Sequence, residues 1–258
     1  MGRTNLSPAN DLFRDLVHRH PRLGRTPRGR TPHAHQKKPA AEACFRATLA
    51  HRLRQAALTT TPVKWESELL PHAQLRQLPW PAQPIRVWTQ DESRYGLITI
   101  HRRRVTLRGV KPLAASQHEL EWSYLYGCVE PLTGESFFLA LSALDSELFQ
   151  LFLDQFAQAD RTALHLLILD NGPAHIARQL SLPANVRLVF TPPYTPEVNP
   201  MERVWEDLDA RIAGATPATL DALVDLLFAE LRAYAPEQLA SLTGYPFFKN
   251  AVYALSSI

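Results

Sequence analysis

Three acidic residues stand where the carboxylates of an α/β protein could meet. Asp91 ends the short run "IRVWTQD", Asp170 ends the apolar run "ALHLLILD", and Glu202 follows the proline-rich stretch "TPPYTPEVNP". Both runs have the composition of strands, and sites in α/β sheets form beyond the carboxyl ends of strands. Like charges that lie close together repel one another, but a divalent cation such as Mg²⁺ reverses that cost. The three residues therefore predict a metal-binding carboxylate cluster, in which two ions could act together on a phosphodiester.

Glu202 also has a purely structural interpretation. Asn199 is a good helix N-cap, Pro200 suits the first helical position, and Glu202 could bond back to the cap. The loop ahead of them carries three prolines, Pro192, Pro193 and Pro196. Prolines fix φ and hold the preceding residues extended. A helix cap does not require a stiff preceding loop. A carboxylate that must lie close to two carboxylates distant in the sequence does require one.

Taken singly, the two aspartates have structural alternatives as well. Asp91 could cap the turn after its strand, and Asp170 could form an Asx turn with Asn171 and Gly172. Because both aspartates occur together with Glu202, which follows a stiff proline-rich loop, the catalytic interpretation is favoured over the structural ones.

Composition and charge exclude several classes of protein. At 258 residues the chain can bury a full core, as one large domain or as one domain with an appendage. The net charge of +3 is mild, but Arg and Lys are concentrated in residues 1–38, as in a polyanion-binding arm or a solvated tail. No apolar run approaches the roughly 20 residues of a membrane helix, and no export signal is recognisable. Cys44 and Cys128 lack metal or redox spacing, so we expect reduced thiols in a cytoplasmic protein.

The order of elements predicts an α/β fold. A basic arm of low order is expected over residues 1–40, with one short helix in "NDLFRDLVHRH", and a helical segment with a linker over 41–84. From residue 85 onward we expect a strand, a β-hairpin, a helix, a strand, a helix, a strand and a helix, followed by C-terminal helices. An antiparallel start followed by alternating strands and helices implies a mixed sheet with helices on both faces.

Three long blocks carry a resemblance to a known family. In this order, "WTQDESRYGL", "LILDNGPAH" and "TPPYTPEVNPMERVWEDL" resemble the signature blocks of insertion-sequence transposases of the IS630 group, which belong with the Tc1/mariner superfamily of DDE enzymes. The resemblance takes in "RRRVTLRGVKP", "YLYGCVEPLTGESFF" and "LTGYPFF", and so covers about residues 85 to 250. It implies an RNase H-like catalytic domain over 85–258. Carried over position by position, it makes Asp91, Asp170 and Glu202 the metal-binding triad.

The resemblance also implies an activity and its partners. A DDE transposase would use two Mg²⁺ ions, for which Mn²⁺ substitutes, to hydrolyse a strand at the terminal inverted repeats of its element. The freed 3′-OH would then attack a TA dinucleotide in target DNA. DNA and a second copy in a homodimer are the expected partners, at the bacterial nucleoid, with no membrane and no small-molecule cofactor. The alternatives are an RNase H-like nuclease that only hydrolyses and a decayed transposase that only binds DNA.

Contacts with DNA are predicted outside the triad. A basic extended segment follows the first acid, and its cations could contact phosphates or form a solvated hairpin: Arg102, Arg103, Arg104, Arg108 and Lys111. His175, in the "DN…H" block, could contact phosphate or the substrate end, or could be structural. Trp88, Trp122 and Trp205 are core candidates. Family members normally carry a paired helix-turn-helix region ahead of the catalytic domain, and we interpret residues 41–84 as a remnant of that DNA-binding region. Either the recognition domain was lost, or it is encoded upstream in another frame, or the start of the sequence is assigned wrongly.

Overall fold

The computed structural model describes residues 38–102, 106–111 and 113–256. The short helix predicted over residues 10–20 and nearly all of the basic arm lie outside the described residues. None of the helices in these ranges combines the length and the apolar character that crossing a membrane requires.

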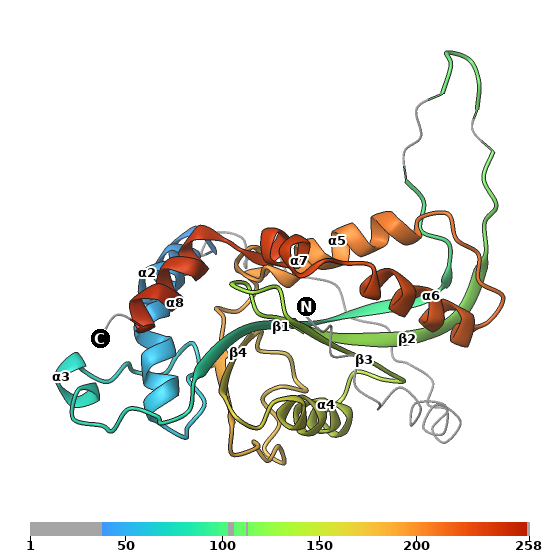
Figure 1. The fold of residues 1–258 in the computed structure, drawn as a ribbon. Coiled ribbons are helices and arrows are strands. Elements are labelled where there is room, and N and C mark those ends of the chain that lie inside the picture. The colour runs from blue at the N-terminus through green and yellow to red at the C-terminus, as the bar shows by residue number, and fades with distance from the viewer. Residues whose placement is uncertain (1–37, 103–105, 112, 257–258) are drawn as a thin grey trace.

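A mixed sheet of five strands forms the centre of the molecule (Figure 1). Its strands, in the order β3-β2-β1-β4-β5 across the sheet, are β1 (Ile85–Ile98), β2 (His118–Val129), β3 (Ser136–Leu141), β4 (Leu164–Leu169) and β5 (Val186–Phe190). The first three pair antiparallel, whereas β4 and β5 run parallel to β1. Every residue of β4 is buried, as expected of an apolar strand that is covered on both faces. The predicted mixed sheet is therefore confirmed.

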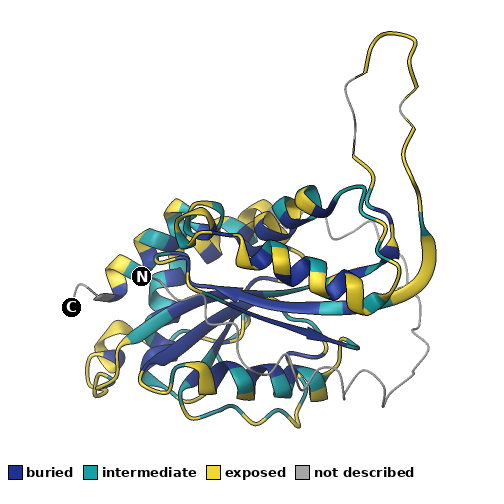
Figure 2. Cartoon of the chain, turned by 45° about the vertical axis from the view of Figure 1, so that its right-hand side comes forward, coloured by how far each residue is buried: buried dark blue, intermediate teal, exposed yellow. Residues whose placement is uncertain are grey.

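Helices cover both faces of the sheet (Figure 2). On one face lies α4 (Ser146–Ala159), whose Asp145 cap accepts hydrogen bonds from the N–H groups of Glu147 and Leu148. The apolar stripe of α4 includes Phe149, Phe152 and Phe156, which pack in one cluster with inward residues of the sheet. Spacings of three and four residues put these rings on a single side of the helix.

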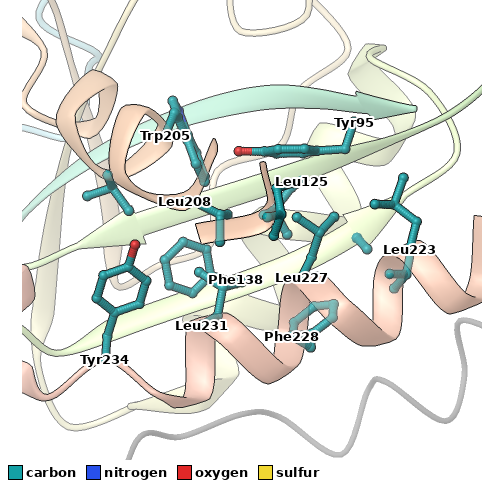
Figure 3. Packing of buried hydrophobic residues seen from close by; sticks show 14 of the residues in the cluster. Tyr95, Leu125, Phe138, Trp205, Leu208, Leu223, Leu227, Phe228, Leu231 and Tyr234 are labelled. Carbon is teal, nitrogen blue, oxygen red and sulfur yellow. The ribbon is translucent and has the colours of Figure 1, made fainter. Parts of the chain in front are cut away.

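The opposite face carries two groups of helices. Over β1 and β2 lie α5 (Met201–Ile212), α6 (Leu220–Arg232) and α7 (Pro236–Thr243), and their shared cluster is drawn in Figure 3. Over β4 and β5 lie α2 (Lys38–Leu58) and α8 (Pro246–Ser256), which pack against each other. A short helix, α3 (His72–Leu75), lies between α2 and the sheet along the chain.

Helix α2 shares its core with the sheet. Phe45, Leu49 and Leu53 are fully buried in one cluster with residues of β4 and β5. Their four-residue spacing places them on one side of the helix, and the helical segment predicted within residues 41–84 is present. The boundary predicted at residue 85 thus crosses a continuous core, while the interpretation of residues 41–84 as a remnant of a DNA-binding region stays a prediction.

Two expectations were wrong. The helix expected between β4 and β5 is replaced by turns, in a connection over residues 170–185 that contains Gly172, Pro173 and Pro183. Strand β1 does not end at Asp91 but continues to Ile98, because β2 goes on pairing with it after its pairing with β4 has stopped at Thr89. Asp91 therefore lies within strand β1, just after the pairing with β4 has ended and where only the pairing with β2 continues.

Candidate active site

The two aspartates lie level with each other at one edge of the sheet. In the parallel ladder Thr89 of β1 is opposite Ile168 of β4. Asp91 and Asp170 each follow two residues later, so both stand at the carboxyl end of the parallel part of the sheet. Sites in α/β sheets form at this edge.

Asn199 attaches the start of α5 to β1. Its side-chain Oδ1 accepts hydrogen bonds from the Thr89 hydroxyl at 2.6 Å and from the Met201 N–H at 3.2 Å. Its Nδ2 donates to the carbonyl of Gln90 at 3.1 Å. The helix begins at Met201, one residue later than the predicted start at Pro200, and Glu202 lies in its first turn. Because Gln90 directly precedes Asp91, this attachment sets the place of Glu202 relative to Asp91.

The proline-rich loop ahead of Asn199 is itself folded. It forms the 3₁₀ helix η2 (Pro196–Val198), and the Thr195 hydroxyl donates to the carbonyl of Pro192 at 2.7 Å. Tyr194 adopts a left-handed backbone conformation with φ of 59°, which an L-residue rarely takes outside a constrained turn. The stiffness that the prolines predict is thus reinforced by hydrogen bonds.

Asp91 and Glu202 form a pair of interacting acids on the α5 face. Burial raises the pKa of Asp91 well above its usual range, and the negative charges of Glu92 and Glu202 raise it further. A hydrogen bond from Trp205 Nε1 to Asp91 Oδ2, 3.1 Å long, acts in the opposite direction. Glu202 is exposed as a residue, yet partial loss of solvent and the charges of nearby acids raise its pKa as well. Added positive charge would stabilise this pair.

Asp170 belongs to a second network, centred on His175. Its Oδ1 accepts from the Gly172 N–H and bonds to His175 Nδ1, both at 2.8 Å. His175 Nε2 bonds to Glu92 Oε1 at 2.9 Å, and Gln90 Nε2 donates to the same oxygen at 2.8 Å. The side chains of His175 and Glu92 are buried, whereas that of Asp170 is 59% exposed. His175 therefore joins a buried acid to an acid at the surface.

Hydrogen bonds within this network shift the pKa values of its members. Burial lowers the pKa of His175, but its hydrogen bonds to Asp170 and Glu92 outweigh that effect and raise the pKa to about 10. Burial likewise acts to raise the pKa of Asp170, and the bonds from His175 and the Gly172 N–H overcome it, so that the pKa is lowered. At neutral pH His175 is a cation between two carboxylates.

The predicted triad is thus brought to one edge in two parts. The charge of Glu202 raises the pKa of Asp91, while Asp170 stands level with Asp91 and is bonded to His175. Within the described ranges, no group of three or more His, Cys, Asp and Glu side chains is arranged to hold a metal ion. The donor chemistry nevertheless fits a hard divalent cation, because all three side chains offer carboxylate oxygens and the partly buried Asp91 lies near further acids.

The residues predicted to contact DNA fall into different environments. Arg102, Arg108 and Lys111 are exposed on the connection between β1 and β2, whose described parts project from the body of the molecule (Figure 1). Arg103 and Arg104 lie outside the described residues. His175 is 4% exposed, and both of its ring nitrogens are bonded to carboxylates.

Two contributors were not recognised as such in the sequence. Trp205 was expected only in the core, and Asn199 only as a helix cap. A signal for Trp205 was present, since it lies three residues after Glu202, and residues at that spacing share one side of a helix. The link from Asn199 to β1 had no local signal, because its partners Thr89 and Gln90 are distant in sequence.

Comparisons with known proteins agree with this architecture. A family model described as DDE superfamily endonuclease matches residues 86–224. The chain is similar in fold to the Mos1 strand transfer complex, with 12% identity, 91% of this chain and 81% of that chain covered, and a TM-score of 0.51. For the Mos1 mariner paired end complex with Mn the identity is 12%, the coverage 96% and 86%, and the TM-score 0.53. The predicted RNase H-like fold is confirmed.

The chain is also similar in sequence to a curated protein. It is the uncharacterized protein y4pE/y4sA of Sinorhizobium fredii (strain NBRC 101917 / NGR234), which is 37% identical over 86 residues. The match spans 33% of this chain and 64% of that relative's length.

Proposed function

Because the chain belongs to the family of DDE superfamily endonucleases, we propose that it is a DNA transposase of the IS630 group within the Tc1/mariner superfamily. The observation that carries this proposal is the partly buried Asp91, whose pKa is raised by the charges of Glu92 and Glu202, with Asp170 level with Asp91 at the same edge. Carboxylates that lie near one another and have lost part of their solvent repel each other unless a cation compensates them. Such an arrangement can bind the divalent cations that assist phosphodiester cleavage.

Divalent cations complete the proposed site. Asp91, Asp170 and Glu202 would hold two Mg²⁺ ions, or Mn²⁺ in their place, since these ions take oxygen ligands from few carboxylates. A protein of similar fold, the Mos1 paired end complex, carries Mn in its name. When bound, such ions activate the attacking oxygen and stabilise the leaving oxygen of the phosphodiester.

The protein's own side chains prepare this edge. Asn199 holds the first turn of α5 against β1, which keeps Glu202 beside Asp91. His175 holds one oxygen of Asp170, while the side chain of Asp170 remains largely exposed to an incoming ligand. We assign His175 to this role because both of its nitrogens are engaged.

Two reactions follow at the same site. Water breaks a phosphodiester P–O bond at the end of the element, which leaves a 3′-OH. That oxygen then forms a new P–O bond in the target DNA at a TA dinucleotide and displaces the 3′-oxygen of the target strand. An element has two ends, which two copies of the chain would cut, so the proposal includes a homodimer acting at the bacterial nucleoid.

Exposed cations would hold the DNA. Arg102, Arg108 and Lys111 lie on the projecting connection between β1 and β2 and would contact phosphates without reading sequence. The basic residues 1–38 would add to this affinity. Recognition of terminal inverted repeats is the task of a helix-turn-helix region in the family.

The test is the pair of variants Glu202→Gln and Glu147→Gln in the full chain. Both glutamates are exposed and occupy the second position of an α-helix, in α5 and α4 respectively, so loss of charge at a helix start is matched. Cleavage and strand transfer are measured on a duplex that carries candidate element ends, with Mg²⁺ or Mn²⁺. Glu202→Gln should lose cleavage by orders of magnitude and keep DNA binding, while Glu147→Gln should match the wild type.

Other results would change the assignment. Cleavage by Glu202→Gln at the wild-type rate would remove Glu202 from the site. Cleavage by the wild type without strand transfer would indicate a hydrolytic nuclease. DNA binding by the wild type without any metal-dependent cleavage would indicate a protein that only binds DNA.

A further inference from the structure

Trp205 contacts the candidate site from helix α5. It lies three residues after Glu202 in the same helix, a spacing that brings two side chains to neighbouring positions on the helix surface. Its indole Nε1 donates to Asp91 Oδ2 at 3.1 Å, and the residue is 5% exposed. One helix therefore brings both an acid and a hydrogen-bond donor to Asp91.

The strand next to Asp91 has room for the indole. Gly127 of β2 is the register partner of Asp91. A Cβ at Gly127 would lie 2.6 Å from a ring carbon of Phe138 and 2.7 Å from Cη2 of Trp205, closer than real Cβ contacts. Phe138 packs edge-on against Trp205 with ring centroids 6.1 Å apart, and Figure 3 shows both rings in the cluster over the sheet. The site of the indole thus depends on a glycine and an aromatic ring from two further strands.

The chemistry of the donor suits an acid that must bind a cation. An indole N–H donates one hydrogen bond, accepts none, and carries no charge. A lysine or arginine at this place would neutralise Asp91 and repel a metal ion by direct charge repulsion. Trp205 fixes the carboxylate and leaves its negative charge available. Partners that orient a ligand in this way affect metal affinity as well as geometry.

We propose that Trp205 is a positioning residue of the metal site, which fixes the Asp91 carboxylate through Oδ2 so that Asp91 and Glu202 present their oxygens together. Gly127 is the second part of this device, because it leaves the space in which the indole lies. The inference rests on the proposed function. It concerns how the Asp91 carboxylate is oriented, whereas the proposed function concerns whether Asp91 binds the metal ion.

The first measurement needs no metal. Indole N–H resonances are recorded by NMR on the metal-free full chain, and the resonance of Trp205 is assigned as the one that Trp205→Phe removes. Asp91→Ala deletes the acceptor, so this resonance should shift upfield while that of Trp88, whose Nε1 donates to His165, stays in place. An unmoved Trp205 resonance would overturn the positioning role.

The second measurement compares Trp205→Phe with Trp88→Phe. Both tryptophans are buried, both donate one indole hydrogen bond, and they belong to clusters on opposite faces of the sheet. Mn²⁺ affinity is measured by calorimetry without DNA, and DNA cleavage as a function of Mn²⁺ concentration. Trp205→Phe should weaken Mn²⁺ binding by about 10- to 100-fold, the usual loss for a partner of a metal ligand, and Trp88→Phe should not.

A glycine pair gives the same test without altering the donor. Gly127→Ala places a methyl group against the indole and should weaken Mn²⁺ binding although Trp205 is intact. Gly96→Ala is the control, because its Cβ would meet another tryptophan, Trp122, at 2.9 Å in the same ladder of β1 and β2. It should lose stability without losing Mn²⁺ affinity.

The outcomes separate the two proposals. Wild-type protein that neither binds Mn²⁺ nor cleaves DNA would overturn the proposed function. Wild-type protein that does both, with Trp205→Phe and Gly127→Ala equally active and equally tight for Mn²⁺, would overturn the role of Trp205 alone.

Discussion

Acidic side chains on the two faces of the same sheet edge have opposite electrostatic environments. On the α5 face Asp91 and Glu202 interact with each other, and the only direct side-chain donor to Asp91 in the described part of the chain is the neutral indole of Trp205. On the α4 face Glu92 and Asp170 share the cationic ring of His175. Asp91 and Glu92 are neighbours in the chain, and the alternation of a strand sends them to different faces.

The difference lies in the hydrogen-bond partners of the acids: Asp91 has a neutral donor, Trp205, whereas Glu92 and Asp170 are both bonded to His175. The pKa of Asp91 is raised, which means that its negative charge is unfavourable in the structure, whereas the pKa of Asp170 is lowered. The environment of Asp91 does not contribute to stability, because removing an uncompensated carboxylate from solvent opposes folding. We therefore propose that the cations bind beside Asp91 and Glu202, and that His175 supports Asp170, the third proposed ligand, from the α4 face.

The largest expected effect comes from Asp91→Asn compared with Glu92→Gln. Asp91→Asn should lower DNA cleavage by more than about 100-fold, the upper end for partners of metal ligands, and should raise Tm because a buried charge is removed. Glu92→Gln should lower Tm, since His175 loses a charged partner. Cleavage assays and thermal unfolding of both variants check this. A fall in Tm for both would erase the distinction between the faces.

A smaller effect is expected for His175→Ala. It leaves the buried Glu92 without its main partner, which should cost roughly 1–3 kcal/mol in the free energy of unfolding, and it releases Asp170. Cleavage should fall by about 10- to 100-fold at saturating Mn²⁺. His165→Ala is the control, because His165 is also buried on the α4 face and bonds to Trp88 away from the acids. Equal loss of cleavage in both variants would show that His175 acts only through stability.

A moderate effect is expected when a divalent metal ion is added, because the resulting rise in Tm should differ between variants of the two faces. Ligand at about 100 times its Kd stabilises a folded protein by about 2.7 kcal/mol, so Mg²⁺ or Mn²⁺ should raise the Tm of the wild type, and a chelator should reverse the rise. Asp91→Asn should respond little and Glu92→Gln should respond fully. An equal response of Asp91→Asn and the wild type would place the ions elsewhere.

The smallest expected effect is the pH dependence of the His175 network. The pKa of His175 is raised from its unfolded value of about 6.5 to about 10, so its contribution to stability is complete below the lower value and is lost as pH rises through the higher one. The difference in Tm between wild type and His175→Gln should be largest near pH 6 and should shrink progressively towards pH 10. A difference that stays constant over this range would show that the ring is not charged.

The sequence determined most of the elements and supplied the candidate residues of the site. Apolar β-rich runs such as that of β4 predict strands covered on both faces, and spaced phenylalanines predict α4, because burial patterns follow the period of each element. The motif blocks led to Asp91, Asp170 and Glu202 as candidates, and the match to the endonuclease family over residues 86–224 bears out the enzyme class. Their roles as metal ligands stay predictions. The helix expected between β4 and β5 was wrong because Gly172 and two prolines outweigh its few apolar residues.

Tertiary structure decided which acids face one another. The continuation of β1 past Asp91 comes from pairing with β2, and the position of Gly127 opposite Asp91 comes from the register of that pairing. Register and facing depend on contacts between segments that are distant in the chain, and a shift of one residue would turn every side chain to the other face. The hydrogen bond from Trp205 to Asp91 and the ring of His175 between Glu92 and Asp170 exist only once the sheet and its helices have packed. No local pattern of residues contains that information.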